Sequence, residues 1–172
     1  MPDALNAALL VVRIALGVIF LAHGVKHFIN RDKTIRWTAS IGYRQPTVQW
    51  AFMTFGEIAI GLFLALGLLT GFAAAGTVAM MFVAFWTVHR AAGFWITARP
   101  DEGYEYAFLI GATAVVLALA GPGEWSLDEA MEIAVNFDEG VGAVLVAGGV
   151  VAGVVQLLLF YRPSATRNAP SA

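Results

Sequence analysis

Five long runs of apolar residues are the feature that most limits how this chain can fold. They cover about residues 5–29, 48–71, 73–92, 104–121 and 140–161. A bilayer hydrocarbon core of about 30 Å requires roughly 20 apolar residues from a helix that crosses it. The chain of 172 residues is 59% hydrophobic and 13% charged, which is about half the charged share of a soluble domain. The runs therefore predict an all-α integral membrane protein.

Local signals predict where several of these helices begin and end. Pro46 suits the first turn of the second helix, because proline lacks an N–H that would be unpaired there. Gly71, in the stretch GLLTGF between the second and third runs, is expected to form a tight turn outside the hydrocarbon. Ser126 and Glu129 form a capping-box pattern that begins a short amphipathic surface helix. Its apolar face would be formed by Leu127, Met131, Ala134 and Val135.

Basic residues predict the orientation of the five spans. Nine of the ten lysines and arginines fall on one side of the membrane, whereas the opposite side carries only acidic residues. Because cytoplasmic loops are rich in lysine and arginine, the N-terminus is expected outside and the C-terminus in the cytoplasm. The predicted location is the cell membrane. The nine residues are Lys26, Arg31, Lys33, Arg36, Arg44, Arg90, Arg99, Arg162 and Arg167.

Two opposite charges lie within the first two apolar runs. Arg13 and Glu57 are at similar depths on antiparallel helices, within about one helical turn of each other. Each charge alone costs about 2.5–3.5 kcal/mol near the bilayer centre. Gly17 and Gly61, one turn after each charge, would let the two helices approach closely. We expect Arg13 to bond to Glu57, either as a structural pair or as part of a polar pocket.

Polar and aromatic residues of three spans gather near the predicted cytoplasmic side, and they form the candidate ligand pocket. Histidine and tyrosine there could hydrogen-bond the carbonyls of a quinone, and two histidines on facing helices could ligate a b-type haem. His23 and His27 could also start a metal site, but no HExxH or similar motif occurs, so no metal is assigned. Histidines that are simply hydrogen-bonded at helix interfaces are the commonest alternative. The candidate residues are His23, His27, Trp86, His89, Tyr104 and Glu105.

The ordered combination of these features resembles the DoxX family of small membrane proteins over roughly residues 9–129. An early arginine, the sequence HGVK, a glutamate in the middle of the second span and GPGEWSLD after the fourth span carry the resemblance. The residues concerned are Arg13, Gly17, Phe20, His23, Gly24, Lys26, Gly42, Glu57, Gly67, Thr70, Gly121, Gly123, Ser126, Leu127 and Asp128.

The resemblance implies a four-helix transmembrane core, here about residues 1–129, and an association with redox physiology. Family members include a subunit type of thiosulfate:quinone oxidoreductase. The chain departs from the family by adding a surface segment and a fifth transmembrane helix over residues 130–161, whose Gly148, Gly149 and Gly153 suit helix packing. Residues 162–172 are expected to form a disordered cytoplasmic tail.

The expected function is that of a membrane subunit of a quinone-linked oxidoreductase system, with a membrane quinone as the cofactor. The chain has no cysteine and no flavin or cluster motif, so electron transfer would require a partner redox protein in the membrane or at its surface. The alternative is a non-catalytic membrane adaptor or a carrier of a small apolar molecule. Nucleic acid is not an expected partner, because membrane topology already accounts for the basic residues.

Overall fold

The computed structural model describes residues 2–136 and 138–163, and this part of the chain is helical without a β-strand. A single isolated bridge joins Tyr43 to Tyr161. The predicted disordered tail falls mostly on residues 164–172, outside the described residues. The α-helices are α1 (Asp3–Ile29), α2 (Arg31–Ser40), α3 (Pro46–Leu66), α4 (Thr70–Ala84), α5 (Glu105–Ala120), α6 (Leu127–Ala130) and α7 (Glu139–Phe160). A π-helix, η1 (Phe85–His89), and a 3-10 turn, η2 (Arg90–Ala92), extend α4, and a 3-10 turn, η3 (Ala134–Asn136), follows α6.

The turn between α3 and α4 lies earlier than the sequence predicts. Helix α3 begins at Pro46, as expected, and ends before Gly67, which adopts a left-handed conformation with φ 64°. Leu69 is also left-handed, with φ 48°, and α4 begins at Thr70. Gly71 therefore lies inside α4 rather than in the turn. The reason is that glycine at position 67 ends α3 with the left-handed residue typical of helix C-termini.

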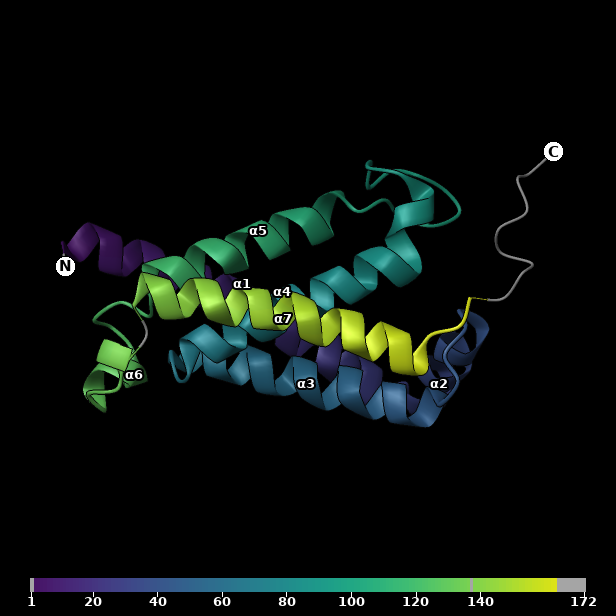
Figure 1. Cartoon of the computed structure of the whole chain (residues 1–172), viewed down its shortest axis with the longest axis horizontal. Helices are drawn as coiled ribbons and strands as arrows, with labels where there is room; N and C mark the ends of the chain where they lie inside the picture. Colours follow the sequence, from purple (N-terminus) through teal and green to yellow (C-terminus); the bar gives the residue numbers. More distant parts are fainter. Residues whose placement is uncertain (1, 137, 164–172) are drawn as a thin grey trace.

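Two polar connections differ from their predicted forms. The polar segment after α1 contains the ten-residue helix α2, which lies across one end of the bundle (Figure 1). The predicted amphipathic helix begins correctly, because the Ser126 hydroxyl accepts a hydrogen bond from the Glu129 N–H at 3.1 Å. However, α6 ends after four residues. Glu132 has a positive φ of 59°, so no continuous helix passes through it.

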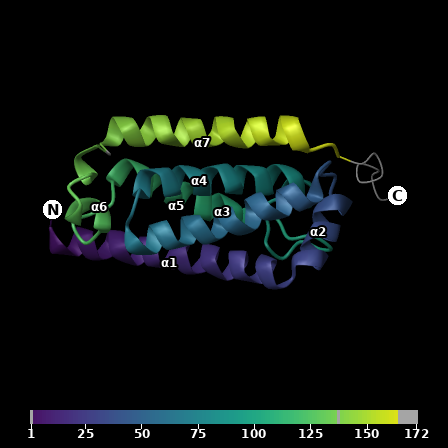
Figure 2. The ribbon, with the colours of Figure 1, turned by 90° about the horizontal axis from the view of Figure 1, so that it is seen from below.

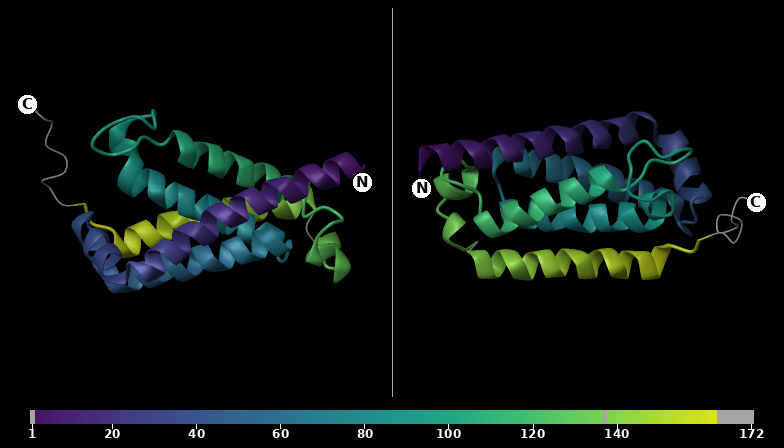
Figure 3. Two further views of the ribbon diagram at one scale, coloured as in Figure 1. Left: turned by 180° about the vertical axis from the view of Figure 1, so that it is seen from behind. Right: turned by 90° about the horizontal axis from the view of Figure 1, so that it is seen from above.

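The long helices form two packed groups. Helix α1 packs mainly on α3, while α4 packs on both α5 and α7. Figures 2 and 3 show α1 and α7 on opposite sides of the bundle. A Cβ atom on Gly17 would lie 2.9 Å from the Gly61 carbonyl oxygen, and one on Gly24 would lie 3.0 Å from that of Thr54. The predicted glycine contact between the first two spans is thus observed, and it fixes their register.

Four helices in the described part of the chain are long and apolar enough to cross a membrane. They are Asp3–Ile29, Pro46–Leu66, the combined α4–η2 segment Thr70–Ala92, and Glu139–Phe160. Helix α5 is apolar but has only 16 residues, fewer than the usual range of about 17–25. The structure therefore supports a multi-pass helical membrane protein with four clear spans rather than the five predicted.

The two ends of the bundle carry different elements. The N-terminus and α6 lie at one end, and α2 lies at the other with the C-terminal end of α7 (Figures 1 and 2). The buried core between the helices is apolar, and includes Leu9, Leu16, Phe20, Leu64 and Leu117. The candidate site described next lies between the two helix groups, toward the α2 end.

Candidate functional site

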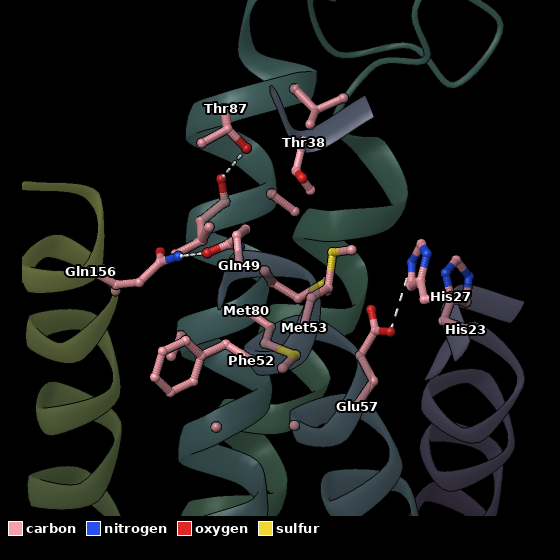
Figure 4. Close-up of a pocket in the computed structure, with 18 of the residues that line it drawn as sticks. His23, His27, Thr38, Gln49, Phe52, Met53, Glu57, Met80, Thr87 and Gln156 are labelled. Carbon is pink, nitrogen blue, oxygen red and sulfur yellow. Dashed lines mark hydrogen bonds and ion pairs between the residues drawn. The ribbon is translucent and has the colours of Figure 1, made fainter. Parts of the chain in front are cut away.

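A cavity of about 720 Å³ lies between the α1–α3 pair and the group formed by α4, α5 and α7. Residues of α2 and of the loop after it close its end, including Thr38 and Tyr43. Small-molecule sites in proteins typically have volumes of about 300–1,000 Å³. The cavity is therefore large enough to hold a ligand, and Figure 4 shows the polar side chains on its walls.

One wall of the cavity carries His23 and His27 of α1 and Glu57 of α3 (Figure 4). The His27 Nε2 atom lies 3.7 Å from Glu57 Oε2. The two imidazole rings have centroids 6.2 Å apart. The two histidines are one helical turn apart on the same helix, so their rings both reach the cavity above Glu57. This arrangement brings three groups that can bind a proton or a cation to one place.

The opposite wall is built from amides and hydroxyls. The Gln156 amide nitrogen of α7 donates to the Gln49 carbonyl oxygen of α3 at 2.5 Å. The Tyr43 hydroxyl is buried beside Gln156 and Thr87, and burial raises the pKa of Tyr43 above the ordinary tyrosine value. Figure 4 shows that Met53 and Met80 lie between this wall and the histidines, while the Phe52 ring lies on the side of Gln156. The cavity thus has polar groups at two sides and an apolar interior.

His89 also lines the cavity, but its ring nitrogens already have protein partners. Nδ1 lies 2.7 Å from the Glu102 carbonyl oxygen, so it carries the proton and donates to that oxygen. Nε2 lies 2.6 Å from the Tyr106 hydroxyl, which donates to it. A neutral imidazole has one donor and one acceptor, and both are used. His89 therefore positions the loop before α5 and Tyr106, and its ring is not available for the haem or metal ligation considered from the sequence.

The other three residues of the predicted pocket lie elsewhere. Trp86 stacks on Phe82 and lies under the Arg90 guanidinium. Tyr104 packs against Phe85. The Glu105 carboxylate accepts a hydrogen bond from the Ile96 N–H at 3.1 Å. Their ring and carboxyl groups contact residues of the α4–α5 connection, and none of the three lines the cavity.

The predicted Arg13–Glu57 pair is not formed. Gly17 and Gly61 contact each other where α1 and α3 cross. Arg13 and Glu57 each precede their glycine by one turn on antiparallel helices, so they lie on opposite sides of the crossing, roughly 11 Å apart along the axis. The sequence analysis estimated the level of each charge by counting residues from the start of its apolar run. In the structure, however, the N-terminal part of α1 extends past the C-terminal end of α3, so the same counts correspond to different levels.

Arg13 instead belongs to a second polar cluster, at the α6 end of the bundle. Its guanidinium donates to the Trp125 carbonyl oxygen and lies directly against the Cα of Gly67. Asp128, which is fully buried, accepts hydrogen bonds from the Leu69 and Thr70 N–H groups at 2.6 and 2.9 Å. Asp128 thus caps α4 and supplies the negative charge near Arg13. This cluster joins α1, the α3–α4 turn and α6.

Several cavity residues were missed by the sequence analysis. Gln49 and Gln156 are isolated amides near the ends of the second and last apolar runs, and buried amides in a bilayer require partners. The need of these two amides for hydrogen-bond partners could have indicated that they face the interior of the bundle. Tyr106 was passed over in favour of Tyr104, two positions earlier, which lies on another side of α5. Helix rotation separates the two, and the sequence did not define it.

These features define a multi-pass membrane protein whose helices line a largely apolar cavity with two histidines and a glutamate on one wall. Residues 8–90 match the family model of DoxX, so the chain carries a DoxX domain and the predicted resemblance is confirmed. This match begins inside α1 and continues through α2, α3, α4 and η1 to the first residue of η2. It does not extend to α5 or to GPGEWSLD, although the resemblance was expected to continue to about residue 129.

One relative is an uncharacterized protein of Haemophilus influenzae, 26% identical over 131 residues. The alignment covers 72% of this chain and 82% of that protein. No solved structure matches the chain. The comparisons thus support the family and the membrane location, while the ligand of the cavity has to be inferred from its residues.

Proposed function

We propose that this protein binds a membrane quinone in the cavity and acts as the membrane subunit of a quinone-linked oxidoreductase. The observation that carries the proposal is the cavity of about 720 Å³, which is apolar inside and polar at two sides. A quinone ring has two opposite carbonyl acceptors and apolar faces. His23 on one wall and the Gln49 amide on the other could donate to the two carbonyls, while Met53 and Met80 contact the ring.

The proposed membrane arrangement has five passes, with the N-terminus outside and the C-terminus in the cytoplasm. Helix α5 runs back between the two ends of the bundle (Figure 1). Its 16 residues would extend about 24 Å, which a bilayer accommodates by local thinning. The α2 end carries Arg31, Arg36 and Arg44, so the positive-inside rule places that end in the cytoplasm.

The test is to extract lipids from the detergent-purified protein and quantify quinones by mass spectrometry. A reduced-minus-oxidised spectrum of the same sample should change in the ultraviolet region, where quinones absorb. Ala79→Phe would fill the cavity, because Ala79 lines it, and should lower the quinone content. Val151→Phe is the matched control, since Val151 is 61% exposed on α7, and should leave the content unchanged.

The result that would reject this function is a monodisperse protein that carries no quinone and copurifies with no redox enzyme. The alternative, a membrane adaptor or a carrier of a small apolar molecule, would then be favoured. A visible cytochrome b spectrum would contradict the hydrogen bonds of His89 if that residue were a haem ligand, because both of its ring nitrogens have protein partners.

A further inference from the structure

On the wall of the cavity that carries the histidines, two hydrogen-bond acceptor atoms face each other, His27 Nε2 and Glu57 Oε2. The Thr34 hydroxyl of α2 donates to the Asn30 carbonyl oxygen at 3.1 Å, so its lone pairs face His27 Nδ1, 3.4 Å away. A hydroxyl has only one proton to donate. The His27 Nδ1 atom is therefore the donor, and the neutral ring presents the Nε2 lone pair to Glu57.

Glu57 Oε2 is the atom that faces this lone pair, at 3.7 Å. It is buried and has no hydrogen-bond donor among the described residues. No lysine or arginine in that part of the chain forms an ion pair with Glu57. Two acceptors that face each other in a low-dielectric site need a cation or a proton between them.

His23 completes a set of three converging groups. One ligand atom each from His23, His27 and Glu57 can be chosen so that all lie within 4.8 Å of one another. Around a zinc ion, nitrogen and oxygen ligands lie roughly 3.3 Å apart. The three atoms would have to move together by about 1.5 Å at most, which side-chain rotation can supply. Figure 4 shows that both histidine rings and the carboxylate already face the same space.

We propose that His23, His27 and Glu57 form a binding site for a divalent transition-metal ion on the wall of the cavity. Two imidazoles and one carboxylate suit Zn²⁺ or Fe²⁺, whereas Mg²⁺ and Ca²⁺ prefer oxygen ligands alone. Histidines at i and i+4 on one helix face are a common metal-binding spacing. Thr34 orients His27 through Nδ1, as the partners of metal-bound histidines usually do. The fourth position of the ion would face the cavity.

This site differs from the one considered from the sequence. His89 and Glu105 were paired with the two histidines there, but His89 is hydrogen-bonded at both nitrogens and Glu105 binds the Ile96 N–H. Glu57, assigned to Arg13 from the sequence, takes their place. The inference does not depend on a quinone, because it rests only on the three side chains and Thr34.

The test uses the full-length protein, purified in detergent through an affinity tag that contains no histidine. Bound metal is removed with a chelator, Zn²⁺ is returned by dialysis, and the zinc content is measured by mass spectrometry. We expect one zinc ion per chain in the wild-type protein. His27→Gln and Glu57→Gln should each abolish stoichiometric binding, and Thr34→Val should weaken it about 10–100-fold.

Glu105→Gln is the matched control, because it also removes one carboxylate near the same end of the bundle but should leave zinc binding unchanged. A wild-type protein without stoichiometric zinc would overturn the proposal, as would binding that persists in the His27 and Glu57 variants. In that case a proton alone bridges His27 and Glu57.

A measurement on the wild-type protein alone tests the site even if the variants fail to fold. X-ray absorption at the zinc edge should show two imidazole ligands. A shell of oxygen ligands without imidazole would place the ion at the surface carboxylates and reject the site. Quinone content is measured on the same preparation. A protein that binds quinone but no zinc rejects only the metal site, whereas a protein without quinone rejects the proposed function.

Discussion

The two polar clusters along α1 bury ionisable groups in different ways. At the α6 end, Arg13 is 1% exposed and Asp128 is fully buried, and both bond to backbone groups of neighbouring turns. At the α2 end, His27 and Glu57 face each other beside a cavity, and the carboxylate oxygen has no donor among the described residues. The first cluster is bonded to fixed backbone groups, although Arg13 Nε and Nη1 have no hydrogen-bond partner among the described residues, and the second lies on the wall of a cavity.

This difference separates structural charge from functional charge. A buried charge that is bonded to fixed backbone groups stabilises a particular packing of helices. An ionisable group that lies on the wall of a cavity within the membrane, without a donor from the protein, is retained at a free-energy cost. The comparison therefore predicts large stability effects at the α6 end, and mainly binding effects at the α2 end.

Asp128→Ala is expected to have the largest effect on stability. It leaves the Leu69 and Thr70 N–H groups without an acceptor and Arg13 without its nearby negative charge. Breaking such a buried charge interaction costs about 3–5 kcal/mol. Thermal unfolding in detergent measures the loss. Asp138→Ala is the control, because Asp138 also caps a helix, through Val141 N–H, but is exposed. It should lose only about 1 kcal/mol, and equal losses would contradict the comparison.

Gly17→Ala should have the next largest effect, because it disturbs the crossing that separates the two clusters. The added Cβ would lie 2.9 Å from the Gly61 carbonyl oxygen, whereas a Cβ on Gly148 would meet nothing within 4 Å. Forcing the backbones apart costs about 1–3 kcal/mol. Gly148→Ala should leave the unfolding temperature unchanged or slightly raised. If Gly17→Ala behaves in the same way, the close contact does not set the register.

Glu57→Gln should change stability little, by about 1 kcal/mol or less, because Oε2 accepts no hydrogen bond from the described residues and lies 3.7 Å from His27 Nε2. Asp128→Asn provides the comparison, since the amide nitrogen cannot accept the hydrogen bond from a backbone N–H. Unfolding temperature and folded yield are measured for both variants. A Glu57→Gln protein that is as unstable as Asp128→Asn would make Glu57 a structural residue, as the adaptor alternative requires.

Tyr43→Phe should have the smallest effect, visible only at high pH. Burial raises the pKa of Tyr43 in the folded protein, so the unfolded chain loses the phenol proton first. Stability from this group is complete below the ordinary tyrosine pKa of about 10 and is lost as the pH rises through the folded value. The unfolding temperature of the wild-type protein should therefore fall relative to that of Tyr43→Phe as the pH rises above about 10. Parallel curves would show that Tyr43 is not the titrating group.

Much of the fold could be predicted from the sequence because apolar run length and helix-end signals are local. Pro46 at the start of α3 and Ser126 before α6 were correctly identified for this reason. The turn at Gly67 and the early end of α6 were not, since both depend on backbone conformations at single residues. Helix α2 was missed because its residues are polar, and its position across the bundle end is set by contacts with α3.

The candidate site could be predicted only in part. His23, His27 and His89 do line the cavity, because titratable residues in apolar runs are rare and easily recognised. Their partners were misassigned. Glu57 was paired with Arg13 from its depth in the membrane, although the register of the two helices separates them by about two helical turns.

The sequence by itself determined that this chain is a helical membrane protein, and which polar groups its helices carry into the bilayer. The length and hydropathy of each run decide that, whatever the neighbouring helices do. Only the tertiary structure decided that Arg13 belongs with Asp128, that His89 is already bonded, and that His27 and Glu57 share a cavity. Helix rotation and register come from the close contact of Gly17 with Gly61, and contacts between distant residues decide which charges meet.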